Sequence, residues 1–197
     1  MISSLFLAHS ITCAPQSFTA QSFETGGKVE SAKPGSKFTM AIAYSPNGRY
    51  LACAHHDGTV NLLDAETNKP LAKMPSAHAR AVRGICFSSD SRTLMTGSED
   101  MHIAQFDVGS AAHIASLSGH NSWVSSVAFS PADDLAFASG SCDRKVKVWD
   151  ARKRECLNTF EDQNDQVWAI AYSPDGRNIV AGAEDGAVSV YEVQKSG

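Results

Sequence analysis

The sequence predicts an all-β protein assembled from four copies of one unit of short strands. Each copy carries a turn serine, at Ser45, Ser88, Ser130 and Ser173, in steps of 43, 42 and 43 residues. Each also carries a turn aspartate, at Asp57, Asp100, Asp143 and Asp185, in steps of 43, 43 and 42 residues. An acidic residue closes each copy, at Asp64, Asp107, Asp150 and Glu192, again in steps of 43, 43 and 42. Three landmarks that keep one period through four copies indicate a repeat architecture.

The third copy shows how each unit divides into strands and turns. Its first expected strand is "VSSVAF" (124–129), and a turn of Ser, Pro and Asp leads to the second, "LAFAS" (135–139). The third strand, "KVKVWD" (145–150), alternates strictly with period two. The polar "ARKR" then leads to the fourth strand, "ECLNTF" (155–160). Four strands in about 43 residues that end in Trp-Asp are typical of a β-propeller blade.

Two stretches of this copy, "SGHNSWVSSVAFSP" and "DRKVKVWD", resemble the WD-repeat (WD40) propeller family, and the resemblance covers about residues 37 to 197. It implies that a buried polar network of His, Ser or Thr, Asp and Trp holds each blade together. In the third copy the matching residues are His120, Ser139 or Ser141, Asp143 and Trp149. The second copy supplies His78 and Asp100, but Phe106 replaces the tryptophan; the first copy ends in Leu63 and the fourth in Tyr191. We therefore expect the whole network only in the third blade.

The repeat also sets the domain organisation. We expect an irregular segment at 1–21, the end of a preceding blade at 22–36, and blades at 37–78, 79–120, 121–163 and 164–197, the last without its outer strand. Because one blade cannot bury its faces alone, neighbouring blades must stack. The favoured architecture is part of a seven-bladed ring, since seven blades of this size need roughly 300 residues. The alternative is a closed four-bladed ring in which an N-terminal strand pairs with the last blade.

Charge and motifs argue against catalysis and against nucleic-acid binding. The net charge is −4, and the basic cluster at 144–154 has acidic neighbours, so we expect no direct contact with nucleic acid. The sequence contains no phosphate-binding glycine loop, no HExxH zinc motif and no nucleophile elbow. "GSCD" (140–143) and "HHD" (55–57) coincide with the periodic turns, which explain them better than a nucleophile or a metal site does. We expect no enzyme activity, cofactor, metal ion or small-molecule substrate.

The N-terminal residues and the cysteines indicate the cellular compartment in which the protein is expected. Residues 1–17 include an apolar run, but no Lys or Arg precedes Lys28, so the basic region of a signal peptide is missing. The run is also too short to span a bilayer. The five cysteines include no C-x-x-C pair, which favours reduced thiols in the cytosol or nucleus.

Partner binding is expected on the loops that precede the first strand of each blade, because loops on a rigid scaffold commonly carry binding sites. The candidate partner-binding residues are Phe38, Met40, Arg80, Arg83, Trp123, Asp165, Gln166 and Trp168. Trp123 and Trp168 are the leading candidates, because large aromatic side chains are common interface anchors. The alternative for either tryptophan is that it packs between two blades.

Longer stretches, above all "VKVWDARKRECLNTFEDQNDQVWAIAYSP", are similar to WD-repeat subunits of the superkiller RNA-decay complex and the Paf1 transcription-elongation complex. The resemblance implies a non-catalytic scaffold whose partners are subunits of those two complexes, in the cytoplasm and the nucleus. The alternative functions are a WD-repeat adaptor of another assembly, such as a ubiquitin-ligase substrate receptor, and a propeller hydrolase.

Overall fold

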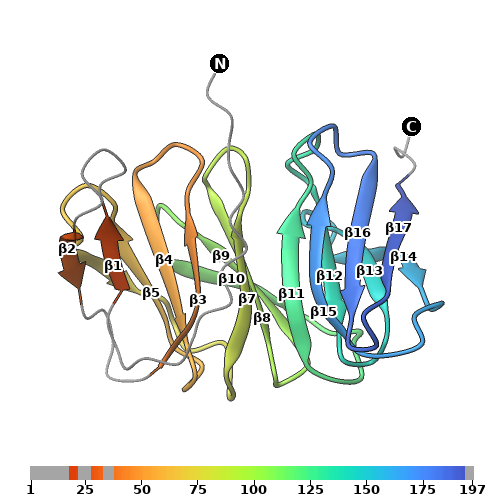
Figure 1. The fold of residues 1–197 in the computed structure, drawn as a ribbon. Helices are drawn as coiled ribbons and strands as arrows, with labels where there is room; N and C mark the ends of the chain where they lie inside the picture. The colour runs from red at the N-terminus through yellow and green to blue at the C-terminus, as the bar shows by residue number, and fades with distance from the viewer. Residues whose placement is uncertain (1–17, 22–27, 33–37, 194–197) are drawn as a thin grey trace.

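The computed structural model describes residues 18–21, 28–32 and 38–193. These residues form strands, turns and loops but no helix, so none of them belongs to a helix that could cross a membrane. Four of the sheets repeat along the chain as blades (Figure 1). The predicted all-β propeller fold is confirmed.

Each blade is an antiparallel sheet whose strands pair in chain order. The first blade consists of β3 (Thr39–Tyr44), β4 (Tyr50–His55), β5 (Val60–Asp64) and β6 (Pro70–Lys73). The second consists of β7 (Val82–Phe87), β8 (Thr93–Ser98), β9 (Ile103–Asp107) and β10 (Ala112–Leu117). The third consists of β11 (Val124–Phe129), β12 (Ala136–Ser141), β13 (Val146–Asp150) and β14 (Glu155–Phe160). The fourth consists of β15 (Val167–Tyr172), β16 (Asn178–Ala183) and β17 (Val188–Glu192).

The four strands of the third blade follow the predicted order, with small differences in the bounds of the second and third. The second strand continues through Gly140 and Ser141, which the sequence analysis placed in a turn. Gly140 pairs with Val146 in the ladder, and a Cβ atom added to it would lie 2.7 Å from the Cγ1 atom of Val167 in the next blade. This glycine therefore allows two blades to approach closely and does not bend the chain.

The N-terminal part differs from the prediction. Residues 18–21, expected to be irregular, form β1 (Phe18–Gln21), which pairs with β2 (Lys28–Ala32) in a separate antiparallel sheet. The aromatic and β-branched residues Phe18 and Thr19 favour a strand there. Residues 1–17 and most of the expected blade end at 22–36 lie outside the described residues.

The blades form an open arc. Their first strands, β3, β7, β11 and β15, lie next to one another in that order on the inner side. The fourth blade and the β1–β2 sheet are at opposite ends of the arc, and β1 pairs with β2 (Figure 1). The alternative of a closed four-bladed ring, with an N-terminal strand on the last blade, is therefore wrong for this structure. The seven-bladed ring stays a prediction.

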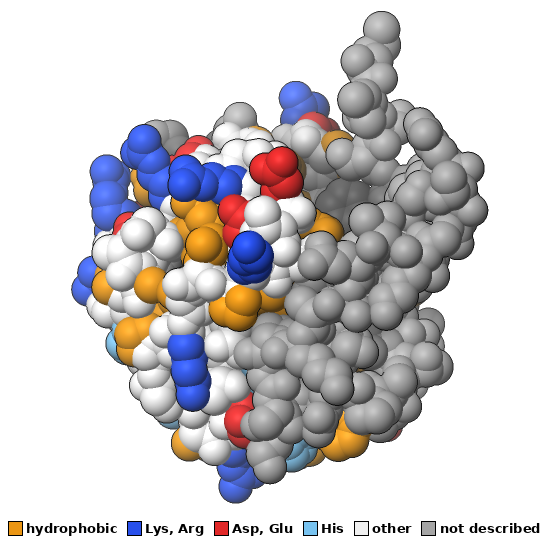
Figure 2. Space-filling model, turned by 90° about the vertical axis from the view of Figure 1, so that its left-hand side faces the viewer, with side chains coloured by type: hydrophobic (Ala, Val, Ile, Leu, Met, Phe, Trp, Pro, Cys, Tyr) orange, Lys and Arg blue, Asp and Glu red, His pale blue; other side chains and the backbone are white. Residues whose placement is uncertain are grey.

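The hydrophobic core lies between successive blades. Val146 and Val148 of the third blade are 0% and 3% exposed and pack in one cluster with Ile179 of the fourth. Val188 and Val190 occupy the same repeat positions in the fourth blade, but they are 70% and 64% exposed. The fourth blade thus presents an apolar face without a neighbouring blade among the described residues. At the other end of the arc, Figure 2 shows hydrophobic side chains lying among Lys and Arg side chains on the described surface.

Candidate protein-interaction surface

A hydrogen-bonded network holds the third blade together. Two contacts involve His120: Nδ1 lies 2.8 Å from Oδ2 of Asp143, and Nε2 lies 2.7 Å from the Ser139 hydroxyl. The indole N–H of Trp149 donates to the same hydroxyl at 2.8 Å. Ser141 accepts the backbone N–H of Asp143 at 3.0 Å and so fixes the turn. The network ties the loop before the first strand to the turn between the second and third strands.

The second blade has the same network with one donor removed. The His78 side chain lies 3.0 Å from Asp100 and 2.8 Å from the hydroxyl of Thr96. Phe106 is buried where the third blade has its tryptophan and offers no N–H to the Thr96 hydroxyl, which donates instead to the backbone carbonyl of Ala104 at 3.4 Å. Thr96 was not among the predicted network residues, although it precedes Ser139 by one repeat of 43 residues.

Hydrogen bonds lower the pKa of both network aspartates. Burial raises the pKa of the Asp100 carboxyl, but hydrogen bonds from His78 and from the backbone N–H groups of Ala79 and His102 outweigh it and lower the pKa to about 2. Burial and the hydrogen bond from His120 oppose each other at Asp143 in the same way, and the pKa of that carboxyl is also lowered.

The first and fourth blades use other polar pairs in the corresponding region. In the first, the buried His55 ring lies 2.9 Å from the Asn61 amide and 3.3 Å from the Thr39 hydroxyl. In the fourth, the buried Gln163 amide donates to the Tyr191 hydroxyl at 2.5 Å. The repeat placed Gln163 and Tyr191 at the positions of His120 and Trp149, but neither pair was predicted, because their residue types differ from those of the third blade.

One edge of the arc gathers the predicted partner-binding loops. In each blade a backbone N–H from the turn between the second and third strands donates to a carbonyl of the loop before the first strand, at 2.9 Å. The four pairs are His56 to Phe38, Glu99 to Ala81, Cys142 to Trp123, and Glu184 to Gln166. We call this the lower edge, since the first strands begin there and run upward in Figure 1. The edge at their other end is the upper edge.

The predicted partner-binding residues differ in how far they are exposed. Phe38 is 45% and Trp168 is 39% exposed, and Arg80 is also exposed. The remaining five are half-buried: Met40, Arg83, Trp123, Asp165 and Gln166. The structure brings all eight to the lower edge or to the lower ends of the first strands.

A β-bulge positions Trp168. In β15, Val167 pairs with Ala183 and Ala169 pairs with Gly182, which leaves Trp168 as the extra residue between them. Met40, Arg83 and Ser125 occupy the same bulge in the other blades. A bulge turns its extra side chain away from the regular alternation of the strand. The sequence shows no sign of it, because one bulged residue does not disturb the repeat spacing.

The backbone around Trp168 is anchored on the third blade. The Ser125 hydroxyl donates to the carbonyl oxygen of Val167 at 2.5 Å, and the N–H of Ile170 donates to the Ser126 hydroxyl at 3.3 Å. The indole is thus an exposed aromatic group on a fixed backbone, which lowers the entropy lost when a partner binds.

Trp123 has a neighbour that covers it. The guanidinium carbon of Arg83, from the second blade, lies 5.2 Å from the centroid of the Trp123 ring. The same guanidinium pairs with Glu99 at 2.5 Å. The cation–π contact joins the second and third blades. Trp123 therefore makes a contact between two blades, which is the alternative that the sequence left open for it.

The two stretches considered for chemistry carry turn contacts. His55 of "HHD" is buried against Asn61, and the Ser141 hydroxyl of "GSCD" contacts backbone groups. Burial raises the pKa of the Cys142 thiol, which lowers the fraction present as the thiolate. Within residues 38–193 and the two short N-terminal strands, no three His, Cys, Asp or Glu side chains are grouped as metal ligands.

An arc of stacked antiparallel blades, three of four strands and one of three, each held by a His–Ser/Thr–Asp network or by another polar pair, defines a WD-repeat propeller protein. The family model "WD domain, G-beta repeat" matches residues 68–107, 112–150 and 154–192. The model "Anaphase-promoting complex subunit 4 WD40 domain" matches residues 23–81. The chain therefore belongs to the WD40 repeat family, whose members generally act as scaffolds that bind other proteins.

Several curated proteins are similar to the chain. The maize "Guanine nucleotide-binding protein subunit beta" is 28% identical over 183 residues, which cover 86% of this chain and 48% of that protein. The tobacco subunit beta-1 gives the same figures. "WD repeat-containing protein SL1-17" of Schistosoma mansoni is 35% identical over 217 residues, 86% of this chain and 69% of that protein. The chain spans about half the length of the guanine nucleotide-binding subunits that it matches.

Proposed function

We propose that this protein is a non-catalytic scaffold whose lower edge binds a segment of a partner protein, with Trp168 as its anchor. The observation that carries the proposal is the exposed indole, 39% accessible, on a bulge whose backbone is held by Ser125 and Ser126 of the neighbouring blade. Tryptophan is enriched among the residues that dominate binding energy at interfaces. Arg80 and Phe38 extend the same edge and add a cation and a second exposed aromatic ring.

The partners proposed are subunits of the superkiller complex in the cytoplasm and of the Paf1 complex in the nucleus. The sequence resemblance in the stretch 146–174, which contains Trp168 itself, supports this choice. The similarity to guanine nucleotide-binding subunits supports the scaffold and does not select the partner.

The experiment is capture of purified superkiller and Paf1 subunits on the immobilised protein, with Trp168→Ala and Tyr44→Ala compared. Tyr44 is a matched control: it is 57% exposed and lies at the upper end of its first strand. We expect Trp168→Ala to lower capture at least about tenfold, as removal of a central aromatic anchor does, and Tyr44→Ala to leave it unchanged. Far-ultraviolet circular dichroism checks that both variants keep the fold.

Two outcomes would refute different parts of the proposal. Undiminished capture by Trp168→Ala would remove the anchor role. Failure of the wild-type protein to capture either set of subunits, with Trp168-dependent capture of a ubiquitin-ligase subunit instead, would keep the scaffold and overturn the partners.

A further inference from the structure

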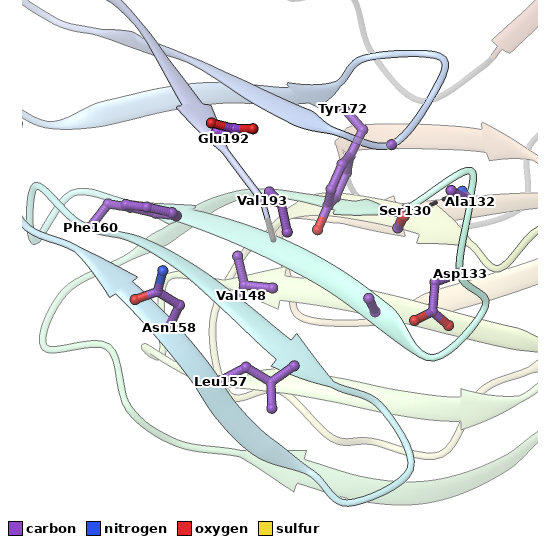
Figure 3. Close-up of a pocket in the computed structure, with 12 residues that line it drawn as sticks. Ser130, Ala132, Asp133, Val148, Leu157, Asn158, Phe160, Tyr172, Glu192 and Val193 are labelled. Atoms are coloured by element: carbon purple, nitrogen blue, oxygen red, sulfur yellow. Dashed lines mark hydrogen bonds between the residues drawn. The ribbon is translucent and has the colours of Figure 1, made fainter. Parts of the chain in front are cut away.

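A crevice of about 500 Å³ lies between the third and fourth blades (Figure 3). Ser130 and Tyr172 line it at the upper ends of the first strands, whereas Trp168 lies at the lower edge. The third blade contributes Ser130, Val148 and Phe160 to its walls, and the fourth contributes Tyr172 and Glu192. Its volume falls within the range of roughly 300–1,000 Å³ that is usual for ligand pockets.

A longer turn in the third blade shapes the crevice. In the other blades the turn serine pairs with the residue five positions later, and its hydroxyl accepts the backbone N–H of that residue, as Ser173 does from Asn178 at 2.9 Å. In the third blade the loop from Ser130 to Ala136 is one residue longer. The Ser130 hydroxyl accepts only the N–H of Ala132, at 3.3 Å. The Ser130 hydroxyl can therefore still donate a hydrogen bond. It faces Gly176 of the fourth blade, because a Cβ atom added to Gly176 would lie 3.1 Å from the hydroxyl oxygen.

A buried hydroxyl without a partner points into the same space. The oxygen of Tyr172 is buried and makes no hydrogen bond within the described residues. Figure 3 shows the ring descending from β15 with its hydroxyl directed between Val148, Val193 and Ser130. The second and third blades have Phe87 and Phe129 at this repeat position, which carry no hydroxyl. A buried hydroxyl that bonds nothing costs stability, so a native example calls for an explanation.

The remaining lining gives the crevice its charge preference. It includes Asp133 and Glu192 but no Lys, Arg or His residue. Glu192 lies on the outward face of β17 with Val188 and Val190, so of these two only Asp133 can direct its carboxylate toward the crevice. Neither carboxylate forms an ion pair with a described cation; Asp133 accepts the backbone N–H of Leu135 at 2.9 Å. Val148, Leu157 and Phe160 supply an apolar wall beside these acceptors. The crevice thus offers several hydrogen-bond acceptors, negative charge and an apolar surface.

We propose that this crevice binds an arginine side chain of a partner peptide. A guanidinium has five N–H donors and no acceptor, which matches the hydroxyl oxygens of Ser130 and Tyr172 and the carboxylate of Asp133. Its methylene stem lies along Val148 and Leu157, and its flat charged group stacks on an aromatic ring of the lining. The site is separate from the lower edge, so a partner that occupies both edges gains affinity from two contacts.

The test measures binding of a fluorescein-labelled, N-acetylated peptide, Gly-Ser-Gly-Leu-Arg-Leu-Gly-Ser-Gly, by fluorescence polarisation on the whole chain. Matched peptides carry citrulline or lysine in place of arginine. The site variants are Tyr172→Phe and Asp133→Asn. The controls are Tyr44→Phe, the same change at the same repeat position of the first blade, and Asp134→Asn, which removes the carboxylate next along the chain.

We expect the arginine peptide to bind at least about tenfold more tightly than the citrulline peptide, which keeps the shape but lacks the charge, and more tightly than the lysine peptide. Both site variants should weaken binding of the arginine peptide at least about fivefold, while the two controls and Trp168→Ala leave it unchanged. The urea midpoint of Tyr172→Phe should equal or exceed that of the wild type, which separates lost binding from lost fold. Equal binding of arginine and citrulline peptides, no binding up to about 1 mM, or insensitivity to both site variants would overturn the proposal.

Discussion

Trp149 and Ser139 are joined across two strands of the third blade by a hydrogen bond of 2.8 Å from the indole nitrogen to the serine hydroxyl. The same hydroxyl lies 2.7 Å from the ring of His120, and both residues bonded to it are buried. One small side chain therefore satisfies two buried groups that water cannot reach. The bond connects the closing Trp-Asp of the repeat to the loop that begins the blade.

Replacement of Ser139 by alanine is expected to destabilise the protein by about 3 kcal/mol, because it leaves the Trp149 and His120 nitrogens without a partner. The measurement is the free energy of unfolding from urea titration followed by tryptophan fluorescence. Ser118→Ala, at an exposed position of the preceding loop, serves as the control and should cost below about 0.5 kcal/mol. A cost below about 1 kcal/mol for Ser139→Ala would show that the network is not essential to the blade.

Acid should weaken the second blade through Asp100. Its folded-state pKa of about 2 is below its ordinary value of 3.8, so its contribution to stability is complete above pH 4 and is lost as the pH falls toward 2. Between pH 6 and pH 3 this residue should account for a loss of about 1 kcal/mol in the free energy of unfolding. Urea titrations of the wild type and Asp100→Asn at both pH values measure the difference, with Asp134→Asn as the control. An equal loss on acidification in wild type and Asp100→Asn would contradict the assignment.

Cysteine reactivity should follow burial. Cys53 is fully buried in the first blade and burial raises the pKa of its thiol to about 12, whereas Cys156 is exposed on β14. Alkylation of the native protein with iodoacetamide at pH 7.5, mapped by mass spectrometry, should modify Cys156 at least about tenfold faster than Cys53. In 8 M urea the two rates should become similar. Rapid modification of Cys53 in the native protein would mean that the first blade opens readily.

The sequence predicted what depends on spacing and on residue type. The 43-residue period located the blades, and His120, Asp143 and Trp149 could be assigned because they match the family pattern residue for residue. The period placed Gln163 and Tyr191 at the positions of His120 and Trp149, but the hydrogen bond between them could not be predicted, since a different donor and acceptor fulfil the same structural need.

The geometry of the lower edge also could not be predicted from the sequence. The bulge at Trp168 depends on how β15 pairs with β16, which residue identities do not reveal. Trp123 is partly covered because Arg83, 40 residues earlier in the chain, reaches across from the neighbouring blade. The crevice beside Tyr172 required both the longer turn and the stacking of two blades. Each of these features comes from contacts between repeats, whereas the period describes only the repeat itself.

The apolar face of the fourth blade provides a matched test of what stacking contributes. Val146 and Val188 occupy the same position in successive blades, but only Val146 is covered by a neighbour. In the 197-residue chain, Val146→Ala should cost about 2.5 kcal/mol, since it removes buried methyl groups and leaves a cavity, and Val188→Ala should cost below about 0.5 kcal/mol. Urea titration at low protein concentration measures both, and analytical ultracentrifugation confirms that the chain is monomeric there. Similar costs at the two positions would mean that Val188 is covered in solution, and a concentration-dependent cost at Val188 would identify a second copy of the chain as the cover.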